Sequence, residues 1–361
     1  MSSSMEAKPT VLITGGSGLI GSRLVGVLAP HYSLATLDVE PPDTDLLDAG
    51  FIRCDLTDDE SLREGLAQVR ERHGTRLASV VHLAAYYDFS GEPSPLYQDL
   101  TVKGSQRLLH NLRHFQVEQL IFSSSLLVME SVEEGRVINE GSPTEAEWNY
   151  PQSKLAAEKV IREERGDIPT VILRIAGVYD EWCHSIPIAQ HIRRIFEKQL
   201  ESYFFPGDTD HGQPFVHRDD LVDCIRKTID RRTELAPYDL LLIGEEEVMS
   251  YADLQDRLGK LLHGREWPTI RIPKTVAKAG AWAKDQLTAS EEDEPFIKPW
   301  MIDLADQNYP IQISRAKKQL GWRPSHTLSG TLEQMVTNLK SDPARWYQEN
   351  NVPIPENLEA M

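Results

Sequence analysis

The sequence predicts an α/β protein, in which a doubly wound parallel sheet is joined to a smaller, mainly helical C-terminal lobe. Three observations predict this fold class. Through the first half of the chain, short β-branched segments alternate with longer helical patterns, as in successive βαβ units. The strand segments are almost continuously apolar, which is typical of parallel strands that are buried on both faces. After about residue 179 the alternation ends and helical patterns dominate.

The elements of the first half follow in chain order. Thr10–Thr14 is a run of β-branched and apolar residues that predicts the first strand, and the helix after it is expected at Leu19–Leu28. Later runs of the same kind predict strands at Ser33–Asp38, Phe51–Cys54, Ser79–Leu83, Gln119–Ser123 and Thr170–Arg174. Helical apolar spacing predicts helices between these strands, at Asp59–Arg72, Leu96–Phe115 and Tyr150–Glu164.

The second half contains mostly helical patterns. One clear strand is expected at Asp239–Ile243, and helices are expected at Ile188–Lys198, Leu221–Asp230, Ser250–Leu262 and Ser314–Leu320. Ser250 and Ser314 are the expected N-caps, because a serine hydroxyl can accept a hydrogen bond from a free amide of the first turn. The chain beyond about Ser341 is expected to be a peripheral tail, which Trp346 and Tyr347 would dock.

Composition and charge exclude several kinds of protein. With 361 residues, of which 40% are hydrophobic and 26% charged, the chain is long enough for two domains with a sizeable core. Its net charge of −18 repels phosphate backbones and anionic lipids, so neither nucleic acid nor a membrane is expected as a partner. Cys54, Cys183 and Cys224 form neither a disulfide framework nor a CxxC pair. Because the sequence shows no signal-peptide pattern and no apolar segment of membrane-spanning length, a cytoplasmic protein is expected.

A glycine-rich loop follows the first strand directly, with the sequence Thr14-Gly15-Gly16-Ser17-Gly18-Leu19-Ile20-Gly21. Glycines spaced in this way let the backbone approach a pyrophosphate closely, while the N-terminus of the next helix directs its amides at the anion. A simple tight turn is the alternative interpretation. The position of the loop between a predicted strand and a predicted helix favours dinucleotide binding.

Asp38, at the end of the second strand, indicates which dinucleotide is bound. A carboxylate at this position can accept hydrogen bonds from the adenosine ribose hydroxyls, and it would repel a 2′-phosphate. The residues that follow, Val39-Glu40-Pro41-Pro42, contain no arginine. NAD is therefore expected as the cofactor rather than NADP, with an aspartate that only caps a strand end as the alternative.

Tyr150 and Lys154 are four residues apart, which places them on one face of the predicted helix. The ammonium of Lys154 is expected to lower the pKa of the Tyr150 phenol from about 10, so that the phenol can act as an acid or base near neutral pH. Such pairs are common in helices, and the spacing alone leaves a purely structural pair open. Upstream, Phe122-Ser123-Ser124-Ser125 ends the fifth strand and supplies a hydroxyl that can orient a substrate oxygen.

Together these residues resemble the extended short-chain dehydrogenase/reductase family, which includes sugar-nucleotide epimerases, dehydratases and hydroxysteroid-type dehydrogenases built on a Rossmann fold. The resemblance runs from about Pro9 to Lys340. Besides the glycine loop it includes four motifs, namely Cys54-Asp55-Leu56, His82-Leu83-Ala84-Ala85, Phe215-Val216-His217-Arg218-Asp219-Asp220-Leu221 and Ser314-Arg315-Ala316-Lys317-Lys318-Gln319-Leu320-Gly321-Trp322. Five motifs in the family's order are not expected by chance.

The resemblance implies roles for individual residues. Tyr150 would be the general acid/base, Lys154 would bind the cofactor ribose and tune the pKa, and Ser125 would orient the substrate, with Ser124 as the second choice. The implied cofactor contacts are Gly15, Gly18, Leu19, Ile20, Gly21, Asp38, Asp55, Leu56, Leu83, Ala84, Ala85, Thr101, Ser123, Tyr150 and Lys154. The NAD-binding domain is then expected at residues 8–180 and 214–245, the substrate lobe at 181–213 and 246–340, and the peripheral tail at 341–361. A homodimer is implied by analogy with the family alone.

Several family positions are altered, and the changes concern the substrate. Gly177 stands where sugar-nucleotide members carry an asparagine, Gln213 stands where they carry a diphosphate-binding arginine, and no arginine occurs between residues 300 and 314. Each charge-assisted phosphate contact contributes roughly 1.5–3 kcal/mol, so a diphosphate-linked sugar is disfavoured. A phosphate clamp relocated elsewhere is the open alternative, for which the candidates are Arg193, Arg194 and Arg271.

Other altered positions narrow the chemistry further. Leu126 and Leu127 stand where dehydratases carry an acidic pair, so dehydration by that route is disfavoured, and Thr101 replaces a family asparagine near the active site. Candidate substrate contacts are Ser125 and a set of aromatic residues on loops after the strands, where open α/β sheets bind ligands. This aromatic set comprises Tyr86, Tyr87, Phe89, Trp148 and Trp182, for each of which core packing is the alternative.

The expected function is that of an NAD-dependent oxidoreductase, which transfers a hydride at a secondary alcohol or ketone of a small or hydrophobic substrate. A sugar-nucleotide 4-epimerase is the second hypothesis. A non-catalytic dinucleotide sensor is the third, and the complete set of Ser125, Tyr150 and Lys154 weighs against it. The histidines and cysteines do not have metal-binding spacing, so no metal is expected, and His82 and His217 are expected to be structural.

Overall fold

Seven parallel strands form the central sheet of a larger lobe, which we call the sheet lobe. The computed structural model describes residues 8–42, 50–88, 90–287 and 297–355. The sheet has the strand order β12-β8-β7-β5-β1-β2-β3. Its strands are β1 (Thr10–Thr14), β2 (Ser33–Asp38), β3 (Phe51–Arg53), β5 (Ser79–His82), β7 (Leu120–Ser125), β8 (Thr170–Ile175) and β12 (Tyr238–Ile243). All neighbouring strands are parallel, which confirms the predicted doubly wound sheet.

Helices cover both faces of this sheet, because successive side chains of a strand point to opposite faces. On β1, Val11 and Ile13 belong to one core, which α1 (Leu19–Leu28) and α6 (Arg218–Asp230) cover. Leu12 belongs to the opposite core. The helices that cover this second core are α2 (Asp59–His73), α3 (Lys103–Leu112) and α4 (Asn149–Glu164). A π-helical segment over Tyr97–Val102, η1, precedes α3, so the single helix expected at Leu96–Phe115 has an irregular first half.

The strand order grows outward in both directions from β1 and its neighbour β5. In open α/β sheets, ligands bind outside the carboxyl ends of the strands at the point where the order reverses. The glycine loop, Asp38 and Ser125 all lie at carboxyl ends of strands, at the same edge of the sheet. The fold therefore brings the predicted cofactor and catalytic residues to one edge.

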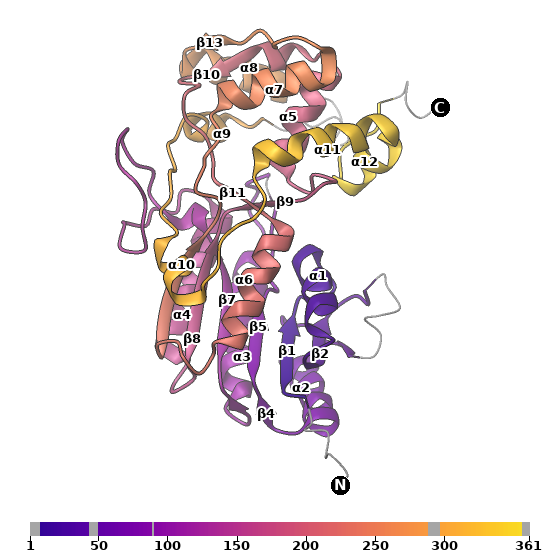
Figure 1. Cartoon of the computed structure of the whole chain (residues 1–361), viewed down its shortest axis with the longest axis vertical. Coiled ribbons are helices and arrows are strands. Elements are labelled where there is room, and N and C mark those ends of the chain that lie inside the picture. The colour runs from indigo at the N-terminus through magenta and orange to yellow at the C-terminus, as the bar shows by residue number, and fades with distance from the viewer. Residues whose placement is uncertain (1–7, 43–49, 89, 288–296, 356–361) are drawn as a thin grey trace.

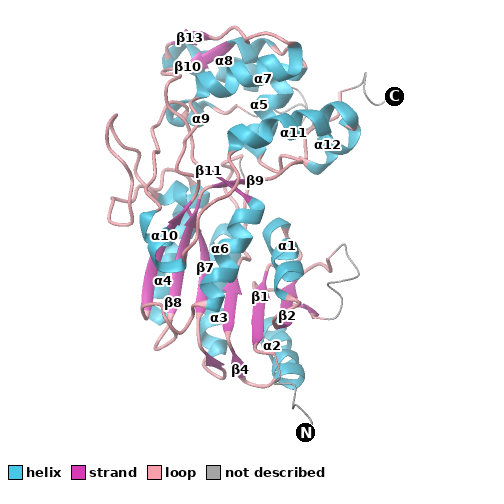
Figure 2. Cartoon of the chain, viewed as in Figure 1, coloured by secondary structure: helices cyan, strands magenta, loops and turns pink. Residues whose placement is uncertain are grey.

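A second lobe, which we call the helical lobe, lies beyond that edge (Figure 1). It is mainly helical, as predicted, with one pair of short parallel strands (Figure 2). These elements are α5 (Ile186–Phe196), the 3-10 turn η3 (Leu200–Tyr203), β10 (Phe204–Pro206), α7 (Tyr251–His263), β13 (Ile270–Ile272), α8 (Lys274–Leu287), α9 (Pro299–Leu304), α11 (Leu328–Ser341) and α12 (Pro343–Glu349). None of the described helices has the length and apolarity to cross a membrane.

The chain passes between the lobes several times. A small parallel pair, β9 (Gly177–Tyr179) and β11 (Phe215–His217), lies where the two lobes meet (Figure 1). Later, α10 (Ser314–Leu320) returns to the sheet lobe and packs on α6 and β12. Ile313, Ala316, Leu320 and Trp322 are buried in the same core as α1 and α6. The domain boundary therefore differs from the prediction, which placed residues 246–340 entirely in the substrate lobe.

Two further details of the C-terminal part differ from expectation. Trp346 and Tyr347 on α12 are fully buried in the core of the helical lobe, so this part of the tail is an integral element and not a peripheral one. Ser314 is the first residue of α10 and does not cap it, because the cap position falls on Ile313. Ser250 is confirmed as the N-cap of α7, since its hydroxyl accepts a hydrogen bond from the Asp253 amide at 3.1 Å.

Candidate active site

The glycine loop turns tightly between β1 and α1. Gly15 has a φ of +75°, which favours glycine, and a Cβ added there would lie 2.8 Å from the backbone nitrogen of Ala84. A Cβ on Gly21 would lie 2.1 Å from the carbonyl oxygen of Gly15. A side chain at either position would collide with backbone. Gly18 is the N-cap of α1 and provides no side-chain cap, so the first turn of this helix can direct its amides at an anion.

Asp38 ties the glycine loop to the end of β2. Its Oδ2 accepts a hydrogen bond from the Ser17 amide at 2.9 Å, and its Oδ1 accepts one from the Val39 amide at 2.8 Å. A carboxylate has about four acceptor sites, so these two bonds leave capacity for ribose hydroxyls. The tight loop, the helix N-terminus and this partly exposed carboxylate together fit an NAD molecule.

His82 is buried beside the glycine loop and bridges two hydroxyl groups. Its Nδ1 lies 2.6 Å from Thr14 Oγ1 and its Nε2 lies 2.9 Å from Ser105 Oγ. Burial, with a contribution from the Lys154 charge, lowers the pKa of His82 to about 3, so the ring is neutral at physiological pH. His217 is likewise structural, because its Nδ1 accepts a hydrogen bond from the Asp219 amide at the start of α6.

Other predicted cofactor contacts also make bonds within the protein. Asp55 Oδ1 accepts hydrogen bonds from the amide of Thr57 at 2.8 Å and from its hydroxyl at 2.7 Å. Ser123 Oγ donates to the His82 carbonyl at 3.1 Å. Thr101, which replaces the family's asparagine, accepts a hydrogen bond from the Tyr86 amide at 3.1 Å. Thr101 therefore holds the chain that follows β5.

The first turns of α4 bring Tyr150 and Lys154 to the end of β7. Lys154 Nζ donates to the Ser123 carbonyl at 2.7 Å and lies 5.8 Å from the centre of the Tyr150 ring. Burial lowers the pKa of Lys154 to about 7. Burial raises the pKa of the Tyr150 phenol, and a side-chain hydrogen bond with Ser125 lowers it.

The structure thus joins Ser125, Tyr150 and Lys154 in one buried group, with one difference from expectation. The expected net lowering of the Tyr150 pKa does not occur, because burial raises this pKa and the hydrogen bond with Ser125 offsets only part of the rise. The physical reason is that burial opposes the charge on Lys154 itself and that its ammonium is directed at a backbone carbonyl.

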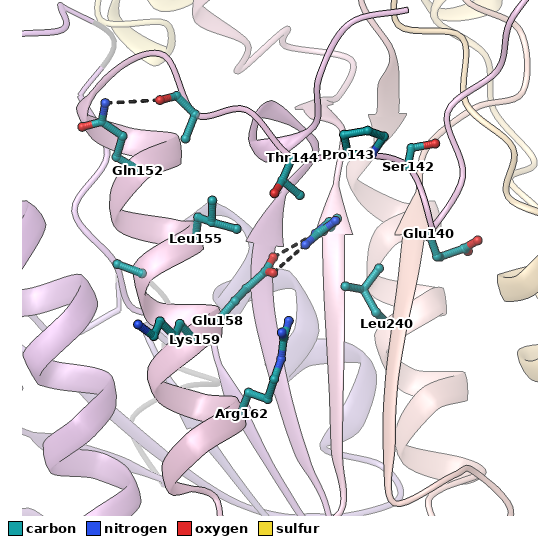
Figure 3. Close-up of a pocket in the computed structure, with 13 residues that line it drawn as sticks. Glu140, Ser142, Pro143, Thr144, Gln152, Leu155, Glu158, Lys159, Arg162 and Leu240 are labelled. Atoms are coloured by element: carbon teal, nitrogen blue, oxygen red, sulfur yellow. Dashed lines mark hydrogen bonds and ion pairs between the residues drawn. The ribbon is translucent and has the colours of Figure 1, made fainter.

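A buried ion pair fixes α4 against the sheet. Glu158, one turn after Lys154, accepts hydrogen bonds from Arg174 on β8 at 2.7 and 3.0 Å. Figure 3 marks the two bonds of Glu158 with dashed lines. Its Oε1 also lies 2.5 Å from the hydroxyl of Ser124 on β7. Ser124, the second choice for the orienting hydroxyl, is therefore engaged with Glu158. The ion pair lies at the wall of a surface hollow of about 630 Å³ whose rim includes Glu140 and Lys159.

An aromatic wall, formed by Tyr87, Trp148 and Trp300, lies against Tyr150, the candidate acid/base. The Tyr87 ring meets the Tyr150 ring edge-on at 4.8 Å, and Trp148 lies 5.7 Å from the same ring. Trp300, on α9, packs on Trp148 at 5.1 Å. Rings in this arrangement offer apolar surface next to the reactive hydroxyl.

The other aromatic candidates have different ring partners. Tyr86 packs edge-on against Tyr97 at 4.8 Å, and Trp182 stacks under the guanidinium of Arg345 at 3.9 Å, beside α12. Phe89 lies outside the described residues. Trp300 was not predicted, because the sequence around it carries no motif and only the fold brings α9 to Trp148.

The altered family positions have structural reasons. A Cβ on Gly177 would lie 2.7 Å from the ring of Phe215 on the neighbouring strand, so an asparagine at 177 would collide with that ring.

Gln213, the second altered family position, lines a cavity of the helical lobe. No cluster of three potential metal ligands occurs among the residues that the structure describes.

Comparison of the sequence with known proteins finds a matching family and related chains. The family described as "NAD dependent epimerase/dehydratase family" matches residues 11–244. The chain is 28% identical to sterol-4-alpha-carboxylate 3-dehydrogenase, decarboxylating, of Candida albicans, over 93% of this chain and 99% of that protein. It is 30% identical to short-chain dehydrogenase/reductase family 42E member 1 of Danio rerio, over 87% of this chain and 84% of that protein.

Solved structures show the same fold at lower identity. UDP-glucose 4-epimerase of Thermotoga maritima, solved with UDP-glucose, is 20% identical with a TM-score of 0.67, over 92% of this chain and 99% of that one. UDP-glucuronic acid 4-epimerase of Bacillus cereus, solved with UDP-glucuronic acid and NAD, is 21% identical with a TM-score of 0.66 over the same shares of the two chains.

Proposed function

The chain belongs to the NAD-dependent epimerase/dehydratase family, and on that basis we propose that it is a dehydrogenase/reductase of a compact or hydrophobic secondary alcohol or ketone. As a family member it is an enzyme whose cofactor is NAD. The glycine loop and Asp38 are the groups that would hold the adenosine half of the dinucleotide. What the proposal adds is the nature of the substrate.

The aromatic wall over Tyr150 is the observation that carries the proposal. Tyr87 and Trp148 both contact the ring that bears the reactive hydroxyl, so a substrate oxygen that reaches Tyr150 must pass apolar surface. Burying one aromatic ring of substrate there would contribute roughly 1.5–3 kcal/mol. Phe215 fills the space in which a sugar-nucleotide enzyme of this family would place its asparagine. These contacts favour an apolar substrate over a nucleoside diphosphate sugar.

The residues of the chain supply the proton chemistry. NAD, when bound, supplies the hydride acceptor for alcohol oxidation or the donor for ketone reduction. Burial raises the pKa of Tyr150, so its phenol retains the proton at neutral pH and can donate it from Oη to a carbonyl oxygen. Ser125 hydrogen-bonds to Tyr150 and is placed to bond the same substrate oxygen.

Lys154 would contribute as a ribose ligand. An ammonium has three donors, and Lys154 gives one of them to the Ser123 carbonyl. The remaining donors can hold ribose hydroxyls, which would also favour the charged form of a lysine whose pKa burial lowers to about 7. Lys154 thereby couples cofactor binding to the charge beside Tyr150.

Replacement of Tyr150 by phenylalanine tests the proposed chemistry. Tyr150→Phe removes the proton donor and leaves the ring that packs against Tyr87, so turnover of apolar secondary alcohols should fall at least about 100-fold, the scale of general acid–base catalysis. NADH affinity, measured by nicotinamide fluorescence, should change little. A Tyr150→Phe variant that retains most of its activity would contradict the mechanism.

The substrate class needs a separate measurement. Wild-type protein loaded with NAD is titrated with UDP-glucose and screened with apolar secondary alcohols, with NADH formation as the readout. Turnover of alcohols without UDP-glucose binding supports the proposal. Tight binding of UDP-glucose without alcohol turnover would instead identify the chain as a sugar-nucleotide 4-epimerase.

A further inference from the structure

A second cavity, of about 240 Å³, lies within the helical lobe, between α5, β10, α7 and α9. Its lining is largely apolar and includes Ile188, Phe205, Leu254, Met301 and Ile302. The first turn of α9 borders both this cavity and the candidate active site, because Trp300 belongs to the aromatic wall and the next residue, Met301, lines the cavity. A substrate that lies along α9 could therefore reach Tyr150 at one end and the cavity at the other.

The described lining contains one arginine, Arg194 on α5, and one carboxylate residue, Glu201 on η3. His191 also faces the cavity, but burial lowers its pKa to about 3 and its Nε2 is bonded to Gln255 Oε1 at 2.6 Å. His191 is therefore neutral. His211, the other histidine of the lining, has its Nδ1 2.8 Å from the Asp306 carbonyl oxygen. Arg194 is the only arginine or lysine among the described residues of the lining.

Arg194 differs from the other arginines that could serve as a relocated anion site. Arg193 is paired with Glu197 at 2.8 Å, and Arg271 is paired with Asp208 and Asp210. Within the described part of the chain, the Arg194 guanidinium donates no hydrogen bond and has no carboxylate within ion-pairing distance. Glu201 acts on it through space, and burial lowers the pKa of Arg194. Arg194 is half-buried and lines a largely apolar cavity, so its guanidinium is available to an anion from outside the chain.

We propose that Arg194 binds a carboxylate on the substrate, and that the substrate is a hydrophobic carboxylic acid whose apolar body occupies this cavity. The inference rests on the proposed function and specifies its substrate class. A guanidinium matches a carboxylate with two parallel hydrogen bonds. The described lining contains a single arginine and no lysine, so it suits a monoanion better than a diphosphate.

The size of the cavity agrees with this ligand. An apolar cavity of about 150 Å³ is known to hold a benzene molecule. The volume here, about 240 Å³, therefore accommodates one ring with a short acidic arm. Apolar walls and a single guanidinium together select for a molecule that has an apolar body and one carboxylate.

Paired probes that differ only in charge test the assignment. Calorimetry measures the binding of 4-phenylbutyrate and of its neutral counterpart, 4-phenylbutan-1-ol, to the NAD-loaded protein. Wild type should bind the carboxylate about tenfold tighter or more. Arg194→Gln should remove this preference and leave the affinity for the alcohol within about twofold, while Arg193→Gln, on the same helix, should retain it.

Other outcomes would overturn the proposal. These are equal wild-type affinity for the two probes, a carboxylate preference that survives Arg194→Gln, or tight UDP-glucose binding that Arg194→Gln abolishes.

A second variant keeps the test decisive if Arg194→Gln fails to fold. Met301→Trp fills the cavity without changing its charge and should block the binding of both probes. Unchanged binding to that variant would place the ligand elsewhere and refute the assignment. Turnover of neutral hydrophobic alcohols without any preference for acids would refute this inference alone. Arg194-dependent probe binding without any alcohol turnover would refute the proposed function alone.

Discussion

Lys154 is a buried amine whose surroundings oppose its charge. Its side chain is 3% exposed, and burial lowers its pKa from 10.5 to about 7. Glu158, one helical turn away, acts in the opposite direction and raises the pKa of Lys154. The lysine is thus poised to gain or lose a proton close to neutral pH.

The lowered pKa of Lys154 makes the free energy of unfolding depend on pH between about pH 7 and about pH 10. The unfolded chain keeps the Lys154 proton up to about pH 10, whereas the folded protein releases it near pH 7. Between these values the unfolded state binds more protons, so the free energy of unfolding rises with pH. Lys154→Met lacks this titrating group. Relative to that variant, wild type should therefore gain roughly 2–3 kcal/mol in its free energy of unfolding from about pH 7 to about pH 9.

Urea unfolding of the NAD-free protein at a series of pH values measures this difference. Lys159→Met is the matched control, because Lys159 lies on the same helix and is exposed. The control should follow wild type in parallel across the pH range. A Lys154→Met curve that is also parallel to wild type would contradict the lowered pKa.

At the scale of single residues, the sequence predicted which residues come together at the candidate site but not their electrostatics. Tyr150 and Lys154 are one helical turn apart, and Ser125 ends a strand, so local patterns were sufficient to find them. The pKa of Lys154 depends on how deeply the whole fold buries it. Trp300 is brought to the site from a distant helix, which no local pattern can reveal.

Among the elements, α4 depends on one ionic contact. Glu158 joins α4 to β8 through Arg174 and to β7 through Ser124. Both members of the ion pair are almost completely buried. The contact lies one turn from Lys154, so it also helps to hold Tyr150 and Lys154 in position relative to the sheet.

Loss of one partner in this pair should be costly. Glu158→Gln leaves the Arg174 guanidinium buried without a counter-charge, and the free energy of unfolding should fall by about 3–5 kcal/mol. The double variant Glu158→Gln with Arg174→Met removes the stranded charge and should recover part of that loss. Urea unfolding of the three proteins measures both effects, and a double variant less stable than Glu158→Gln would show that the stranded charge is not the cause.

Elements of the sheet were easier to predict than those after it. Buried parallel strands are apolar along their whole length, and all seven strands of the sheet begin and end within about two residues of the predicted positions. The π-helical turn before α3 was not predicted, because its residues have an ordinary helical composition. Ser314 was expected to cap α10 and instead begins it, since serine is also tolerated inside a first turn.

On the scale of the whole molecule, the C-terminal helix is part of the core. Trp346 on α12 is fully buried among residues of α5, α7 and α11. Trp346→Ala should lower the free energy of unfolding by about 3–5 kcal/mol, as expected for removal of a large buried ring. Trp282→Ala, at a side chain that is 61% exposed on α8, is the control and should change it by less than about 0.5 kcal/mol.

The same variant probes how independent the two lobes are. The groups that would hold NAD lie in the sheet lobe, so NADH affinity of folded Trp346→Ala should stay within about twofold of wild type. Nicotinamide fluorescence titration measures it. A large loss of NADH affinity would mean that the helical lobe shapes the cofactor site directly.

The assignment of α10 to a lobe was beyond the reach of the sequence. Its apolar face, with Ala316 and Leu320, shows that the helix is amphipathic but not which core it covers. Only the path of the chain after α9 decides that it returns to β12.

That return has a consequence for how the protein is made. Translation delivers β12 to solvent long before it delivers α10, and the whole of α7, α8 and α9 emerges in between. During this interval the apolar side of β12 that Ile313 and Ala316 will later cover has no partner from its own chain. Nascent chains with such exposed apolar surface are prone to aggregation and are clients of chaperones. The sheet lobe therefore completes its core only after α10 has been synthesised, and not when β12 has emerged.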